Sequence, residues 1–149
     1  MADYTVKRLE DFEAVFGGGF KRVRAGLGVT SFGLAVMEFP PDFHNYPEHT
    51  QELDSQEEVY TVIEGRAVLY VGDERIDLEP GVWVRIGASE RRRLETEGES
   101  ARVVAIGGVP GGVYEAPDFT EEGAPDPMGK TGIHEGEIEH EKFGLKPLT

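Results

Sequence analysis

Between residues 20 and 108, apolar and polar side chains alternate along short segments in the manner of β-strands. Glycine, proline and aspartate interrupt the alternation, which is typical of an antiparallel sandwich or barrel built from many short strands. Gly72 with Asp73 predicts a tight hairpin, and Pro80 with Gly81 predicts a turn into the next strand. The predicted strands are residues 20–25, 30–39, 57–64, 66–71, 75–78, 82–86, 91–95 and 101–106.

The two ends of the chain depart from this alternation. Before three consecutive glycines, apolar residues recur at helical spacing, which predicts a short packing helix within segment 1–19. After residue 108 the chain becomes acidic and rich in turn-forming residues. We therefore expect a β-domain at 20–108, followed by an extended arm at 109–149 that wraps the domain or a neighbouring subunit. The residues of the predicted helix face are Leu9, Phe12, Val15 and Phe16.

Composition limits the possible functions. The 149 residues correspond to one domain with a substantial core. Lys and Arg number 15 against 29 Asp and Glu, so the net charge is 15 − 29 = −14, which argues against nucleic-acid binding. No apolar run could span a bilayer, and the first residues lack the apolar core of a secretory signal. Without cysteine there is neither a disulfide framework nor a thiolate zinc site, so we expect a cytoplasmic protein that binds no membrane.

The strongest chemical signal is segment 49–65, which reads HTQELDSQEEVYTVIEG. It places His49 and Gln51 two residues apart and leads into an alternating strand that begins near Glu58. Because side chains alternate across a strand, Glu58 and Tyr60 share one face. The segment therefore offers metal-ligand chemistry on a β scaffold.

This segment and a later stretch that ends at Arg92 resemble the two signature motifs of the cupin superfamily. The first family motif reads G-x5-H-x-H-x3 or 4-E-x6-G and the second reads G-x5-P-x-G-x2-H-x3-N; their three histidines and the glutamate hold a divalent metal. On these motifs His49, Gln51 and Glu58 take the first three ligand positions, and Arg92 takes the last. The run between Gln51 and Glu58 is longer than the family spacing. The resemblance covers residues 20–108 and implies an all-β fold, the double-stranded β-helix or jelly-roll barrel of the cupins, with Glu58 and Arg92 facing inward.

Two interpretations of the aligned positions remain open. An imidazole, an amide oxygen and a carboxylate are acceptable ligands for Zn²⁺, Mn²⁺, Fe²⁺ or Ni²⁺, so His49, Gln51 and Glu58 form a candidate metal site. Alternatively, Arg92 pairs with Glu58 through two parallel N–H···O contacts and occupies the space of the metal, since a guanidinium has no lone pair to offer. We favour the site without a metal cofactor, because two ligand positions changed together and one became a cation.

The expected function is the binding of a small polar or anionic molecule inside the barrel by His49, Gln51, Glu58, Tyr60 and Arg92. One alternative is a metal-dependent oxygenase, isomerase or lyase that uses His49, Gln51 and Glu58. A second alternative is a metal-free enzyme in which His49 is the general acid or base.

A homodimer is also expected. Val59, Ile63 and Trp83 form an apolar outer face on the predicted strands, and the arm at 109–149 could reach a second subunit. A second subunit would cover unpaired strand edges.

Overall fold

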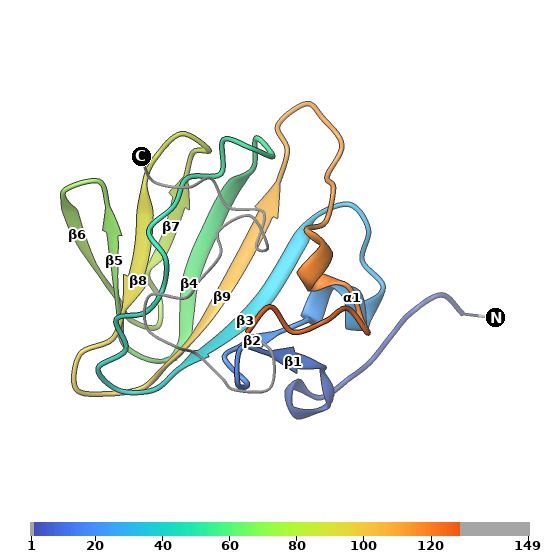
Figure 1. Ribbon diagram of the computed structural model, residues 1–149, viewed down its shortest axis with the longest axis horizontal. Coiled ribbons are helices and arrows are strands. Elements are labelled where there is room, and N and C mark those ends of the chain that lie inside the picture. Colours follow the sequence, from blue (N-terminus) through green and yellow to red (C-terminus); the bar gives the residue numbers. More distant parts are fainter. Residues whose placement is uncertain (1, 129–149) are drawn as a thin grey trace.

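The computed structural model describes residues 2–128 and shows a mostly β chain with one short α-helix, α1 (Val23–Leu27) (Figure 1). The predicted all-β architecture is confirmed. The strands are β1 (Ala14–Val15), β2 (Phe20–Lys21), β3 (Gly33–Phe39), β4 (Glu57–Gly65), β5 (Ala67–Val71), β6 (Glu74–Leu78), β7 (Trp83–Ile86), β8 (Arg92–Glu95) and β9 (Ala101–Gly108). Short 3-10 helices occupy Leu9–Asp11 and Asp118–Thr120.

The strands form two antiparallel sheets. The larger sheet has the order β1-β2-β3-β9-β4-β7, and the smaller has the order β6-β5-β8. The predicted hairpin joins β5 to β6, where Val71 pairs with Glu74 and Gly72 has a φ of 57°. Glycine adopts this left-handed conformation without steric cost, which explains the sharp turn.

The main core lies where the two sheets face each other. On β4, Tyr60 and Val62 are buried, whereas Ile63 is 53% exposed, as the alternation predicts. Leu69, Leu78 and other apolar side chains from the smaller sheet pack against this face. Burial of one such side chain contributes about 1.5–3 kcal/mol, so this face fixes the register of β4.

The N-terminal region differs from the prediction. The short helix expected within 1–19 is limited to the 3-10 turn at Leu9–Asp11, and residues 14–15 form β1, which pairs with β2. The strand expected at 20–25 ends after Lys21, and α1 follows. The side chain of Arg22, at the start of α1, is buried; it pairs with Glu13 and donates to the carbonyl of Phe119, 97 positions away. Local periodicity carries no information on such a distant partner.

Residues 109–128, here called the C-terminal strap, follow β9 and lie beside α1 (Figure 1). Arg22 donates to the carbonyls of Phe119 (2.8 Å) and Ala124 (3.0 Å). Tyr114 packs on Gly33, where a Cβ would lie 2.9 Å from its hydroxyl oxygen. Further contacts join Arg24 to Glu121, Glu13 to the Gly123 amide, and Asp126 to the Phe16 amide. The remainder of the predicted arm, 129–149, lies outside the described residues.

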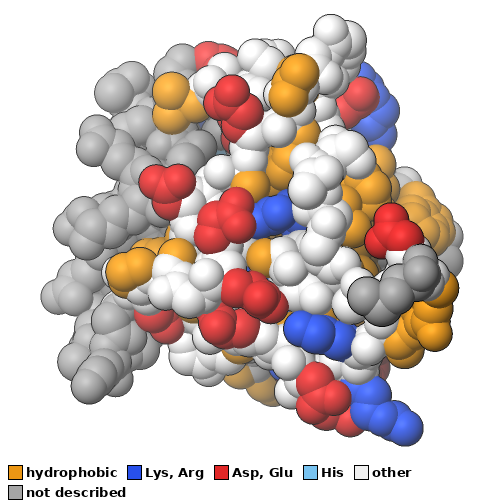
Figure 2. All heavy atoms as spheres, turned by 90° about the vertical axis from the view of Figure 1, so that its right-hand side faces the viewer, with side chains coloured by type: hydrophobic (Ala, Val, Ile, Leu, Met, Phe, Trp, Pro, Cys, Tyr) orange, Lys and Arg blue, Asp and Glu red, His pale blue; other side chains and the backbone are white. Residues whose placement is uncertain are grey.

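Figure 2 shows the face that carries α1 and the strap. Acidic side chains are spread over this face, with apolar side chains visible between them. Within residues 2–128, no helix has the length and apolar character needed to cross a membrane.

Candidate functional site

A cavity of about 790 Å³ lies on the inner face of the larger sheet. Strands β3, β4 and β9 supply one wall, and the segment between β3 and β4 supplies another. The turn before β2 and the C-terminal strap complete the lining. Four predicted site residues line this cavity, namely His49, Gln51, Glu58 and Tyr60.

Backbone pairing brings His49 and Arg92 together. The His49 amide donates to the Arg92 carbonyl (3.0 Å), and the Arg92 amide donates to the His49 carbonyl (2.9 Å). Residues paired in this way across antiparallel strands direct their side chains to the same face. The predicted inward orientation of Arg92 is confirmed, since its side chain is 0% exposed.

One oxygen of Glu58 collects three donors. Arg92 Nη1 lies 2.6 Å from Glu58 Oε1, Tyr60 Oη donates to the same oxygen at 2.9 Å, and Gln51 Nε2 donates to it at 3.3 Å. The predicted ion pair between Arg92 and Glu58 is therefore confirmed. In the part of the chain that the structure describes, no hydrogen bond reaches the other oxygen, Glu58 Oε2.

The predicted pair of parallel contacts is wrong. Arg92 Nη2 donates to the Gly87 carbonyl (2.5 Å) and Nε donates to the Glu90 carbonyl (3.0 Å), so only Nη1 reaches Glu58. Two backbone carbonyls compete for the guanidinium, and the sequence pattern does not reveal them. Arg92 sits behind Glu58 and does not line the cavity.

Hydrogen bonds define the state of His49. Its Nδ1 lies 2.9 Å from the Pro47 carbonyl, which can only accept, so Nδ1 carries the proton. Nε2 then accepts from Gln51 Nε2 at 3.3 Å. The opposite amide orientation would place Gln51 Oε1 against the Glu58 carboxylate. As oriented, Gln51 Oε1 is buried and has no hydrogen-bond partner among the described residues.

The donor set does not fit a transition metal as arranged. The Arg92 guanidinium occupies Glu58 Oε1, and the lone pair of His49 Nε2 faces an amide N–H₂. Within residues 2–128, no three His, Cys, Asp or Glu side chains gather in a geometry that could hold a metal ion. A divalent cation between His49, Gln51 and Glu58 would have to displace Arg92.

The buried tyrosines act as neutral donors. Burial, followed by the charge of Glu58, raises the pKa of both Tyr60 and Tyr46. Their hydroxyl oxygens lie 3.4 Å apart, and because Tyr60 donates to Glu58, Tyr46 donates to Tyr60. Burial also raises the pKa of Glu58, while Arg92, Tyr60 and Gln51 oppose this rise by stabilising the carboxylate.

Two residues of this inner site were missed in the sequence. Tyr46 packs against His49 with ring centroids 5.6 Å apart, and Asp54 lines the cavity. Burial raises the pKa of Asp54, and Gln56 Nε2 donates to Asp54 Oδ2 at 2.8 Å. A usable signal existed for Asp54, because it lies in the run that is longer than the family spacing.

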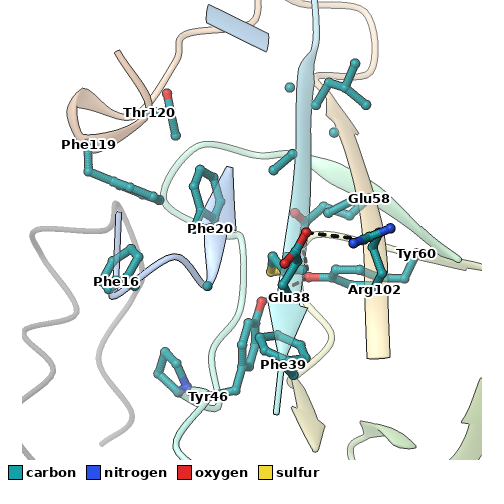
Figure 3. A pocket seen from close by; sticks show the side chains of 18 of the residues that line it. Phe16, Phe20, Glu38, Phe39, Tyr46, Glu58, Tyr60, Arg102, Phe119 and Thr120 are labelled. Atoms are coloured by element: carbon teal, nitrogen blue, oxygen red, sulfur yellow. Dashed lines mark hydrogen bonds and ion pairs between the residues drawn. The ribbon is translucent and has the colours of Figure 1, made fainter. Parts of the chain in front are cut away.

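Three phenylalanines at the cavity, here called the aromatic collar, were also missed. Phe16, Phe20 and Phe119 lie together, on the side away from Glu58 and Tyr60 (Figure 3). Their ring centroids are 6.3 Å (Phe16 to Phe20), 5.7 Å (Phe16 to Phe119) and 5.0 Å (Phe20 to Phe119) apart, all with edge-to-face geometry. No local pattern joins Phe119 to the other two, since the contact depends on the docking of the strap.

The family model of the cupin domain matches residues 35–107. Among solved structures, a cupin protein from Bacteroides fragilis has a TM-score of 0.58 and 18% identity, covering 77% of this chain and 92% of that chain. A sugar phosphate isomerase from a cupin superfamily, from Silicibacter pomeroyi, has a TM-score of 0.56 and 16% identity, covering 70% of this chain and 75% of that chain. The DMSP lyase DddQ from Ruegeria pomeroyi has a TM-score of 0.51 and 19% identity, covering 71% of this chain and 55% of that chain.

A comparison with curated proteins finds no match. At these identities the solved structures show a common fold and nothing about a common activity. The family match covers the strands that position Glu58 and Arg92, and the similar structures extend over most of the chain. Residues 35–107 are a cupin domain, and the chain shares its fold with solved cupin structures.

Proposed function

We propose that this cupin binds a small organic molecule in its cavity, with the ion pair between Arg92 and Glu58 standing where its relatives place a metal. The observation that carries the proposal is the cavity of about 790 Å³, which combines apolar walls with a few converging polar groups. Small-molecule sites typically have this size and character. Glu58 supplies a contact point, because its Oε2 is left for a ligand.

Each polar residue has a distinct role in this proposal. Glu58 contacts the ligand, and Arg92 is a positioning residue that holds Glu58 from behind. Tyr60 and Tyr46 donate toward Glu58 and orient it further. The geometry favours a ligand that donates hydrogen bonds over an anion, because the nitrogens of Arg92 are engaged by Glu58, Gly87 and Glu90.

The two enzymatic alternatives are less well supported by the geometry. A metal-dependent oxygenase, isomerase or lyase would need Zn²⁺, Mn²⁺, Fe²⁺ or Ni²⁺ at His49, Gln51 and Glu58. Two of the similar structures are named as a sugar phosphate isomerase and a DMSP lyase. A metal at these three residues requires Arg92 to leave Glu58. General acid or base chemistry by His49 would require it to release its contacts with Pro47 and Gln51.

The test uses protein purified without a metal-affinity tag. Elemental analysis is combined with thermal-shift screening of small amines, alcohols and carboxylates, with and without EDTA. We expect a stabilising compound whose effect is independent of EDTA and is lost in Ala105→Phe, which fills the cavity from β9. Ala14→Phe, on the exposed side of β1, is the control of equal size. A stoichiometric transition metal, or a stabilising compound that binds Ala105→Phe unchanged, would overturn the proposal.

A further inference from the structure

The carboxylates that line the cavity differ in their charge compensation. Arg102 pairs with Glu38 (3.2 Å) and with Glu64 (2.9 Å), and Arg92 pairs with Glu58 (2.6 Å). Asp54 has no basic side chain within ion-pair distance among the described residues. Its carboxylate accepts hydrogen bonds from Gln56, whose side chain and backbone amide both donate to it. Asp54 therefore presents to the cavity a carboxylate that lacks an ion-pair partner among the described residues.

The inner end of the cavity is rich in acceptors and poor in donors. Glu58 Oε2 accepts no hydrogen bond from any described residue, and the nearby Gln51 Oε1 is buried without a partner in this part of the chain. The hydroxyl of Tyr46 donates to that of Tyr60, which donates to Glu58, so both hydroxyl hydrogens are already engaged. A ligand group that donates several hydrogen bonds and carries a positive charge complements this end.

The aromatic collar supplies an apolar surface at the same cavity. Phe16, Phe20 and Phe119 all lie outside residues 35–107, so the collar belongs to the extensions that this chain adds to the family domain. Phe16 adopts a φ of 60°, which is unusual for a bulky residue, and its amide donates to both oxygens of Asp126 in the strap. The fold holds this ring at the cavity against a local backbone preference, which points to a functional position.

We propose that the cavity takes a primary ammonium compound with an apolar body. The ammonium group lies between Asp54 and Glu58 Oε2, and the apolar body packs against the collar. This inference rests on the proposed function of the cavity and adds the chemical class of its ligand. An ammonium group also balances Asp54, whereas a carboxylate or phosphate would add negative charge beside it.

Isothermal titration calorimetry of the full chain tests the ligand class with three probes of similar body: 2-phenylethylamine, 2-phenylethanol and 3-phenylpropanoate. The amine is expected to bind at least about tenfold more tightly than the alcohol, the difference that one charge-assisted contact supplies. The carboxylate is expected to bind more weakly than the alcohol. The inference is overturned if the carboxylate binds as tightly as the amine or more tightly. It is also overturned if none of the three probes binds.

Two pairs of variants locate the contacts. Asp54→Asn should lower the affinity for the amine and leave that for the alcohol nearly unchanged. Asp73→Asn, which removes the same charge from the exposed turn between β5 and β6, should change neither affinity. Phe119→Ala should weaken the binding of the amine and of the alcohol by a similar factor. Val113→Ala, at an exposed position in the same strap, should leave both affinities unchanged. An unchanged preference for the amine in Asp54→Asn overturns the assignment.

The outcomes also separate this inference from the proposed function. A carboxylate that binds the wild type at least as tightly as the amine does, but does not bind Ala105→Phe, would leave a ligand-binding cavity and overturn the ammonium assignment. An amine that binds equally well to Ala105→Phe would contradict both.

Discussion

A single carboxylate oxygen organises the inner site of this protein. Glu58 Oε1 receives hydrogen bonds from a guanidinium, a phenol and an amide, while Oε2 stays available. A buried cation and a buried anion each lose several kcal/mol of hydration, and their mutual attraction offsets this loss only when the pair is intact. Removing one partner is therefore more damaging than the net stability of the pair suggests.

Replacement of Arg92 tests this pairing directly. Arg92→Ala leaves Glu58 without its cation and should lower the free energy of unfolding by about 3–5 kcal/mol. Urea denaturation measures the change. Arg91→Ala, at the exposed neighbouring position, should have little effect. An unchanged unfolding midpoint in Arg92→Ala would contradict the structural role of the ion pair.

A second substitution at the same position should create a metal site. Arg92→His removes the guanidinium from Glu58 and adds an imidazole beside His49, so the affinity for Zn²⁺ or Mn²⁺ should rise above that of the wild type. Calorimetric titration of both proteins measures the difference. Glu58→Gln in the Arg92→His background is the control and should lose the gained affinity. Equal affinity of Arg92→His and the wild type would show that the backbone does not bring the donors together.

Asp54 should give the protein a specific pH dependence. Burial raises its pKa above the ordinary value of 3.8, so the folded protein binds this proton more tightly than the unfolded chain. The contribution of Asp54 to the free energy of unfolding is thus fully present below pH 3.8 and falls as the pH rises through the folded pKa. Asp54→Asn should remove this decline in urea titrations across the acidic range, and Asp73→Asn should retain it. Parallel curves for wild type and Asp54→Asn would disprove the shift.

At the scale of elements, periodicity accounts for the strands and fails for the segments between them. One face of β3, β4 and β9 contributes to the main core, and on β4 this face also carries Glu58 and Tyr60 into the cavity. β3 also buries its other face, through Val36, against Phe12 and Val23. Tyr46 and Asp54 lie in a segment without periodicity. The position of Tyr46 depends on contacts with Tyr60 of β4 and Phe39 of β3, which no local pattern encodes.

Local periodicity is an even poorer guide to the terminal segments. The apolar spacing within 9–16 fits a helix, yet β1 forms because it can pair with β2 at the sheet edge. Arg22 was part of a predicted strand, but its partners Phe119 and Ala124 lie about one hundred positions away. Long-range hydrogen bonds of a buried arginine outweigh a weak local propensity.

The strap should detach when Arg22, the buried arginine that binds it, is replaced. Arg22→Ala loses the contacts to Glu13, Phe119 and Ala124, so amide hydrogen exchange should become faster across residues 113–124. Mass-spectrometric exchange measurements localise the effect. Arg66→Ala, which removes an exposed arginine paired with Glu79, should leave this segment unchanged. Uniform acceleration over all strands would indicate global destabilisation instead of strap release.

At the scale of the whole molecule, one outer surface remains apolar despite the net charge of −14. Trp83 is 66% exposed on β7, the edge strand of the larger sheet, and Ile63 of the adjacent β4 is 53% exposed. An edge strand offers unpaired backbone groups to a second chain. The homodimer stays a prediction that this surface supports.

Light scattering at micromolar concentration tests the assembly. We expect a mass of about twice the 16.4 kDa of the chain, because pairing would cover Trp83 and the β7 edge. Trp83→Arg should shift the mass toward that of the monomer. Leu53→Arg, at a position that is 64% exposed in the segment before β4, should not. A monomeric wild type would rule out this contact.

The position of Trp83 also decides what intrinsic fluorescence can report. It is the only tryptophan of the chain, and it points into solvent from the outer sheet face, away from the cavity. Its emission should be red-shifted and readily quenched by acrylamide in a dilute monomer, and should move to shorter wavelength as subunits associate. Occupation of the cavity should leave this emission nearly unchanged, so the same chromophore separates self-association from ligand uptake.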